Sequence, residues 1–352
     1  MVRERIEAWD FLKTLTIILM VWGHLVQYCV NGEAIDNPLW CWVYSFHMPL
    51  FMTLSGMFAT LGYNSLSFMG YCKKRFLRIL LPCIVWLIIE AVYFMVINDN
   101  MSFSTFAWIM KDGFWFLKSV FICGILGYIA MRSSGNLWIL ITIIISQLIR
   151  IWSVPTMYPC FLLGILIYKK LHWFNSNWKA VTSISTVLFL IISIPISLSP
   201  SFWKIHSSSL FGAESFYRGM LVMGSRFLTM CTGMLASTAL ITGSYVLFKS
   251  IRKQPDWMHK MTKAGRYTLG VYIIQTVVIE TLIAVNFKIP VTTEASYWLV
   301  TLLVFTILSV LLTWLCVRIT AFVCRNYPVV AMILFGEKMR RKTRMDLKYK
   351  IL

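Results

Sequence analysis

Long apolar segments separated by short polar loops make up most of this chain. Most of them approach the roughly 20 residues that an α-helix needs to cross a hydrocarbon core of about 30 Å. The pattern predicts an all-α, polytopic membrane protein with about ten transmembrane helices. We expect these helices at residues 10–30, 39–62, 79–97, 114–131, 136–152, 156–168, 180–199, 219–248, 267–286 and 296–317.

The positions of the basic residues test this count, because each added or missed helix would reverse the side of every later loop. With ten helices and the N-terminus inside, 25 of the 33 Lys and Arg residues fall in cytoplasmic segments, where membrane insertion retains them. We therefore expect cytoplasmic N and C termini and a transmembrane domain over residues 1–335. Residues 336–352 form a basic cytoplasmic tail, predicted either to lie on anionic lipid headgroups or to serve only as a topology determinant.

Composition narrows the class of protein further. The chain is 59% apolar and 13% charged, against roughly 45–50% and about 25% in average soluble proteins. A soluble enzyme is therefore excluded, and so is disorder, because 15% of the residues are aromatic. A net charge of +19 would suit nucleic acid, but the cations lie in short loops between apolar runs, so no nucleic-acid partner is expected. Nine scattered Cys without a CxxC pair predict no metal site.

The first apolar run carries three polar residues, Asp10, Lys13 and His24. An ionisable group at membrane depth costs about 2.5–3.5 kcal/mol on insertion scales, so each needs a partner or a function. The eleven steps from Lys13 to His24 return to within about 20° on an α-helix, and Asp10 can pair with Lys13 at i, i+3. A lone histidine here would more often serve packing, but a stripe of three favours a functional site.

The second run supplies His47, at a depth similar to that of His24, so the two imidazoles could meet. Pro49 removes a backbone donor and tends to kink the helix, which could open a cavity near His47 and Ser55. The alternative is a kink in which His47 only bonds to a carbonyl that the proline has freed.

Two further clusters are candidates for binding. Arg75 and Arg78, at the cytoplasmic mouth of the third run, present forked donors suited to phosphate oxygens; a plain topological anchor is the alternative. Trp115 and Lys118 open the fourth run, where aromatic residues also mark the membrane interface.

These motifs resemble the acyltransferase 3 family of bacterial membrane acyltransferases, whose first helix carries a basic residue, ten residues and then His. The likeness extends along most of the chain, through the Phe-His-Met-Pro-Leu-Phe sequence around His47, the Arg-x-x-Arg pair, Trp115-Phe116-Leu117 and the segment 265–272. Two positions depart from the family's pattern. Lys13 stands where Arg is commoner, and Gln275 where His is frequent, so we assign no role to Gln275 or to the nearby Glu280.

The resemblance implies an enzyme of the bacterial inner membrane that transfers an acetyl or similar acyl group from cytoplasmic acyl-coenzyme A to a hydroxyl. The acceptor would be a cell-envelope carbohydrate or a lipid-linked glycan. We expect His24 to act as general base or nucleophile, supported by His47 and Asp10, with no metal. Acetyl-coenzyme A would bind at Lys13, Arg75 and Arg78. Acceptor contacts are expected from Ser55, Trp115 and Lys118. The competing class is a transporter or flippase, in which the same polar stripe lines a permeation route.

Overall fold

The computed structural model describes residues 7–63, 65–97, 103–132, 136–149, 151–208, 215–251, 254–283, 288–291 and 293–337. These ranges are helical, with one isolated β-bridge between Val30 and Ile289. The predicted tail lies outside them except for its first two residues. The helices are α1 (Glu7–Cys29), η1 (Ala34–Asp36), α2 (Pro38–Tyr44), α3 (His47–Tyr63), α4 (Phe68–Arg75), η2 (Phe76–Leu80), α5 (Leu81–Ile97), α6 (Phe103–Asp112), α7 (Trp115–Arg132), α8 (Asn136–Leu148), α9 (Val154–Lys169), α10 (Leu171–Ser176), α11 (Trp178–Ser197), α12 (Pro200–Ser207), α13 (Phe216–Ser250), α14 (Asp256–Ala264), α15 (Thr268–Thr276), η3 (Val277–Ile283), α17 (Glu294–Trp298), η4 (Leu299–Val304), α18 (Phe305–Asn326) and α19 (Pro328–Phe335).

Six helical segments of the described chain are long and apolar enough to cross a membrane: α1, α4–η2–α5, α7, α11, α13 and α17–η4–α18. The pair α14 and α15–η3, bent by 69°, would add a seventh, while α8 and α9 are apolar but shorter. The all-α, multi-pass architecture is therefore confirmed. The count of ten and the orientation of the termini stay predictions.

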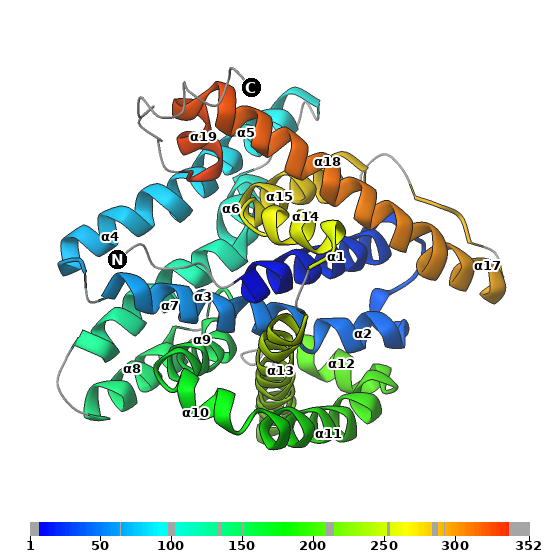
Figure 1. Cartoon of the computed structure of the whole chain (residues 1–352). Helices are drawn as coiled ribbons and strands as arrows, with labels where there is room; N and C mark the ends of the chain where they lie inside the picture. Colours follow the sequence, from blue (N-terminus) through cyan, green and yellow to red (C-terminus); the bar gives the residue numbers. More distant parts are fainter. Residues whose placement is uncertain are drawn as a thin grey trace.

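Helix α1 is the central element of the fold (Figure 1) and packs against α3, α13, α14, α15 and α18. Its residues are buried on several sides, including Trp9, Met20 and Leu25. A helix enclosed in this way keeps its polar side chains inside protein rather than in lipid, which is where functional polar groups of membrane helices normally lie.

Helices α3 and α9 approach each other closely. A side chain at Gly56 would overlap the backbone carbonyl of Phe161, and one at Gly164 would overlap that of Thr53. Small residues at such contacts let membrane helices pack backbone to backbone. This contact fixes α3, which forms one wall of the candidate site.

The predicted run 39–62 is interrupted. Helix α2 ends at Tyr44 and α3 begins at His47, so the break precedes Pro49 instead of following from a kink at it. Pro49 lies in the first turn of α3, where its missing N–H costs no helical hydrogen bond. The expected irregularity is present, but proline marks the start of the second helix.

Candidate active site

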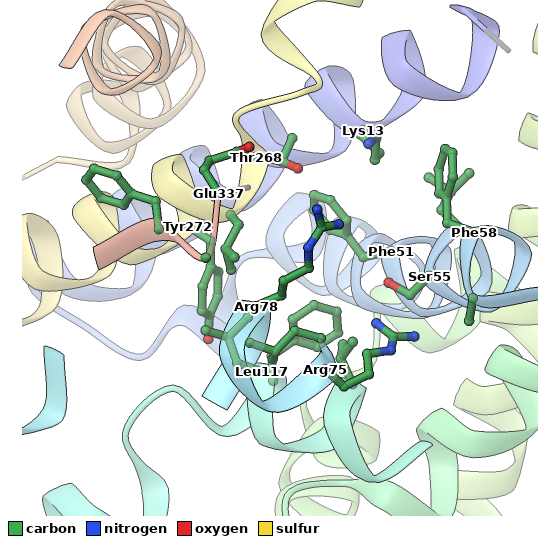
Figure 2. A pocket seen from close by; sticks show the side chains of 18 of the residues that line it. Lys13, Phe51, Ser55, Phe58, Arg75, Arg78, Leu117, Thr268, Tyr272 and Glu337 are labelled. Carbon is green, nitrogen blue, oxygen red and sulfur yellow. The ribbon is translucent and has the colours of Figure 1, made fainter. Parts of the chain in front are cut away.

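A cavity of about 540 Å³ opens between α1, α3, the α4–η2 turn, α7, α15 and α19. Its walls are mainly apolar, with Met20, Phe51 and Phe116 among the lining residues. Cations line one part of it, and Figure 2 shows Arg75 and Arg78 with Lys13 across the opening. Lys74 and the predicted Ser55 also line the cavity. The fold thus brings together four residues predicted from separate parts of the sequence: Lys13, Ser55, Arg75 and Arg78.

The ammonium of Lys13 is fixed by two neighbours. Its Nζ lies 2.9 Å from Oδ1 of Asp10, whose side chain is fully buried, and it stands over the Phe58 ring at 4.6 Å. The predicted pair is present. Asp10 lies fourteen residues before His24, or about 21 Å along the helix axis, so it positions Lys13 and does not reach the imidazole.

Arg75 has the geometry of a preformed anion site. Its Nε donates to the Tyr71 hydroxyl at 2.7 Å, while Nη2 is buried and has no hydrogen-bond partner among the residues that the structure describes. Gly124 of α7 makes room for the guanidinium, since a Cβ there would lie 3.1 Å from Nη2. A buried unsatisfied donor on a charged group is costly, and a phosphate oxygen would satisfy it. Together with the cations nearby, this orphaned donor would suit an anionic ligand such as a phosphate.

His24 lies on α1, which packs against η3. Its Nδ1 is 3.1 Å from Oε1 of Glu280 in η3, with 15% and 30% of the two side chains exposed. The contact has ion-pair distance without the alignment of a hydrogen bond. The Tyr28 ring stands edge-on to the imidazole at 5.9 Å. The Glu280 side chain therefore lies close enough to Nδ1 to favour a protonated ring electrostatically.

Gln275 adds an amide to this group. Its Nε2 donates to the Tyr272 carbonyl at 3.2 Å and to Oγ1 of Thr276 at 2.8 Å. The side chain interacts with His24, is 1% exposed, and its Oε1 has no aligned hydrogen-bond partner. Sequence reasoning left Gln275 and Glu280 without a role. The sequence did contain one signal, because a carboxylate such as Glu280 inside an apolar run is costly unless it has a partner or a function.

The cavity leads toward His24 without including it. Met20, one helical turn before His24, and Tyr272, three residues before Gln275, are among its lining residues. A ligand bound with its charged end at Arg75 and Arg78 would thus point its apolar end toward the imidazole. This direction matches a donor whose phosphates and reactive group lie at opposite ends.

His47 does not join this group directly. Its Nδ1 donates to the Val43 carbonyl at 3.0 Å, which leaves Nε2 as the acceptor nitrogen of the neutral ring. The Tyr44 ring lies 4.5 Å from that of His47 and also packs on Gly23, beside His24. No hydrogen bond links the two imidazoles in the described part of the chain, so their expected meeting is replaced by contact through Tyr44.

Lys118 and Trp115 lie outside the cavity. Lys118 is buried, and its Nζ donates to the carbonyls of Met110 at 2.7 Å and Lys111 at 3.1 Å. It therefore caps the end of α6. Trp115 packs edge-on against Phe116 at 5.9 Å, and it is Phe116 that lines the cavity. The predicted segment contributes to the cavity through Phe116, Leu117 and Val120 and not through Trp115 or Lys118.

Comparison with known proteins identifies the family of this chain. Nodulation protein NolL of Mesorhizobium japonicum is 24% identical over 365 residues, covering 95% of this chain and 91% of the relative. NolL of Sinorhizobium fredii is 32% identical over 181 residues, or 47% of this chain and 49% of the relative. No solved structure matches significantly. The sequence profile of the family described as an acyltransferase domain matches residues 6–318. The chain therefore belongs to the acyltransferase 3 family and is a membrane acyltransferase.

Proposed function

We propose that this protein is an O-acyltransferase of the bacterial inner membrane. It moves an acetyl group, or a similar acyl group, from cytoplasmic acetyl-coenzyme A to a hydroxyl of a cell-envelope carbohydrate or lipid-linked glycan. One observation carries the proposal: a cavity with a cationic part and apolar walls runs along the helix on which His24 meets Glu280. The acetyl group and the carbohydrate acceptor follow from the family resemblance.

The donor's two ends would find matching surroundings. Its phosphates bind Arg75, Arg78 and Lys13, where Arg75 already holds a buried, unpartnered N–H. Its pantetheine arm lies along Phe51, Phe116 and Met20, whose burial against the arm contributes hydrophobic stabilisation. Ser55, between the cationic part and the apolar walls, donates or accepts a hydrogen bond along the arm.

His24 then carries the proton chemistry. As general base, its Nε2 takes the proton of the acceptor hydroxyl while that oxygen attacks the thioester carbonyl. The C–S bond breaks, the new ester forms, and the proton passes to the departing thiolate. As nucleophile, the same nitrogen takes the acyl group first and passes it to the hydroxyl in a second step. Glu280 beside Nδ1 stabilises the charged ring in either route.

The other predicted residues take supporting places. Asp10 holds Lys13, and His47 acts on the His24 region through Tyr44. Trp115 and Lys118 lie outside the donor cavity, and their contacts with the acceptor stay a prediction. We keep membrane lipids as partners, with the basic tail on anionic headgroups.

The test is direct. Purified protein is incubated with labelled acetyl-coenzyme A and a panel of envelope glycans, and we expect label to appear on a glycan in an ester that mild base cleaves. Movement of a glycan across proteoliposomes without acyl chemistry would favour the transporter class instead. If the folded protein neither turns over the donor nor forms a labelled product, the proposal is contradicted.

A further inference from the structure

One wall of the donor cavity comes from beyond the family's matched region. The match ends at residue 318, whereas α19 begins at Pro328. Phe335, Gly336 and Glu337, at the end of α19 and just after it, line the cavity beside Arg78. Figure 1 shows α19 in red against α5, and it also packs on η2, the turn that carries Arg78.

Helix α19 is held in place by specific contacts. The indole Nε1 of Trp86 in α5 donates to the Leu334 carbonyl at 3.0 Å. The rings of Trp86 and Phe335 stack at 6.5 Å with an interplanar angle of 29°. Ala331 and Phe335 are 2% and 3% exposed. The helix is therefore a packed part of the fold that places its C-terminal end in the cavity.

The end of α19 abuts the backbone of Arg78. Gly336 adopts a left-handed conformation, φ +62°, and its N–H donates to the Met332 carbonyl at 3.1 Å while that of Glu337 donates to the Ala331 carbonyl at 3.3 Å, an αL-type helix end. A Cβ on Gly336 would overlap the Arg78 carbonyl oxygen and lie 2.7 Å from the carbonyl carbon. Only glycine permits both this conformation and this contact.

The backbone that Gly336 touches is itself unusual. Arg78 belongs to the π-helical turn Phe76–Leu80. Such turns are rare, occur mostly as single-turn bulges within α-helices and are frequent at functional sites. A π-helical turn also rotates the side chains that follow relative to an α-helix. The contact with Gly336 can therefore fix the direction in which the Arg78 side chain projects.

We propose that the segment Pro328–Glu337 is a positioning element of the donor site, in which Gly336 seats against the Arg78 turn and directs the guanidinium toward the donor phosphates. This proposal rests on the proposed function, because it takes the occupant of the cavity to be a coenzyme A thioester. It adds a segment outside the matched family domain to the machinery that binds the donor.

The test compares coenzyme A binding to the full-length, detergent-solubilised protein and to its Gly336→Ala variant by titration calorimetry. We expect at least tenfold weaker binding in the variant, with kcat at saturating acetyl-coenzyme A within about twofold of the unaltered protein. Gly32→Ala is the matched control, because Gly32 also has a positive φ, +108°, but a Cβ added there would have no atom within 4 Å. Its coenzyme A affinity should stay unchanged.

A double-mutant cycle separates positioning from general damage. If Gly336 acts through Arg78, then Arg78→Ala should weaken binding strongly in the unaltered protein and little further in Gly336→Ala. Arg75→Ala should keep most of its effect in both backgrounds. Unchanged affinity in Gly336→Ala, or a full additional effect of Arg78→Ala, would overturn the proposal.

Three further outcomes have distinct meanings. Should Gly336→Ala fail to fold, Trp86→Phe removes only the bond to Leu334 and keeps the ring stack; it should weaken coenzyme A binding at least threefold, and unchanged affinity would overturn the proposal. Absence of binding by the unaltered protein would overturn the donor assignment and this proposal together. Binding that is intact in every variant would overturn this proposal alone.

Discussion

Nδ1 of His24 lies 3.1 Å from Oε1 of Glu280, joining a residue of the first long helix to one near the end of the ninth predicted run. A carboxyl group at this distance from Nδ1 can stabilise a protonated imidazole and leaves Nε2 for proton transfer or attack. The pair places the reacting ring beyond the inner end of the donor cavity. The imidazole and its carboxylate should therefore govern the chemical step, and the cations of the cavity should govern donor binding.

Replacing Glu280 should slow the chemical step. In Glu280→Gln the side chain keeps its size but loses the carboxyl group beside His24 Nδ1, so we expect kcat to fall about 100-fold or more while donor KM changes little. Steady-state kinetics with acetyl-coenzyme A checks this. Glu90→Gln is the control, because that carboxylate accepts a hydrogen bond from Thr281 at 2.9 Å. Equal effects of the two substitutions would argue against a specific role for Glu280.

Replacing Arg75 should act mainly on the donor. Arg75→Ala removes a guanidinium whose buried Nη2 makes no hydrogen bond within the described part of the chain. A charge-assisted hydrogen bond contributes roughly 1.5–3 kcal/mol, so donor KM should rise about 10- to 150-fold with kcat less affected. Arg75→Lys should recover only part of the loss, since an ammonium lacks the forked donors. Unchanged donor affinity would mean that Arg75 serves only as a topological anchor.

Gly124 should affect donor binding indirectly, because it leaves space for the Arg75 guanidinium. A methyl group there would lie 3.1 Å from both Arg75 Nη2 and the Tyr71 hydroxyl, so Gly124→Ala should displace the guanidinium and raise donor KM several-fold. Gly224→Ala, with nothing within 4 Å of the added Cβ, is the control for adding a methyl group to a helix. The two variants should differ in KM, and equal values would mean that Arg75 does not depend on the space at Gly124.

The α3–α9 contact should govern stability rather than catalysis. In Gly164→Ala the new methyl overlaps the Thr53 carbonyl and forces the helices apart, at a cost of about 1–3 kcal/mol. We expect a lower thermal unfolding midpoint in detergent, measured by intrinsic Trp fluorescence, again with Gly224→Ala as reference. A midpoint equal to that of the reference would mean that α3 and α9 can move apart without loss of stability.

The sequence predicted those parts of the site that local spacing determines. Asp10 and Lys13 are three residues apart on one regular helix, α1, so ideal helix geometry places this pair correctly. Lys13 and Arg75 line one cavity because separate helices pack together. The family resemblance anticipated that grouping, but spacing alone could not.

What the sequence missed depends on tertiary packing and on departures from ideal helices. Glu280 reaches His24 because η3 packs on α1, which no local pattern encodes. Trp115 and Lys118, predicted as acceptor contacts, do not line the cavity, whereas Phe116 does, because the phase of α7 depends on how it packs. The π-helical turn at Arg78 and the interruption before His47 shift side chains in ways that a regular 3.6-residue period does not describe.

The central claim is that His24 performs the acyl transfer, and the most direct measurement is the single-turnover transfer rate of His24→Ala alongside its affinity for coenzyme A. We predict that coenzyme A binds within about twofold of the unaltered protein, because His24 lies beyond the lining of the donor cavity, while the rate falls by roughly 10²–10⁴. A folded His24→Ala protein that transfers acetyl at the normal rate would contradict the account.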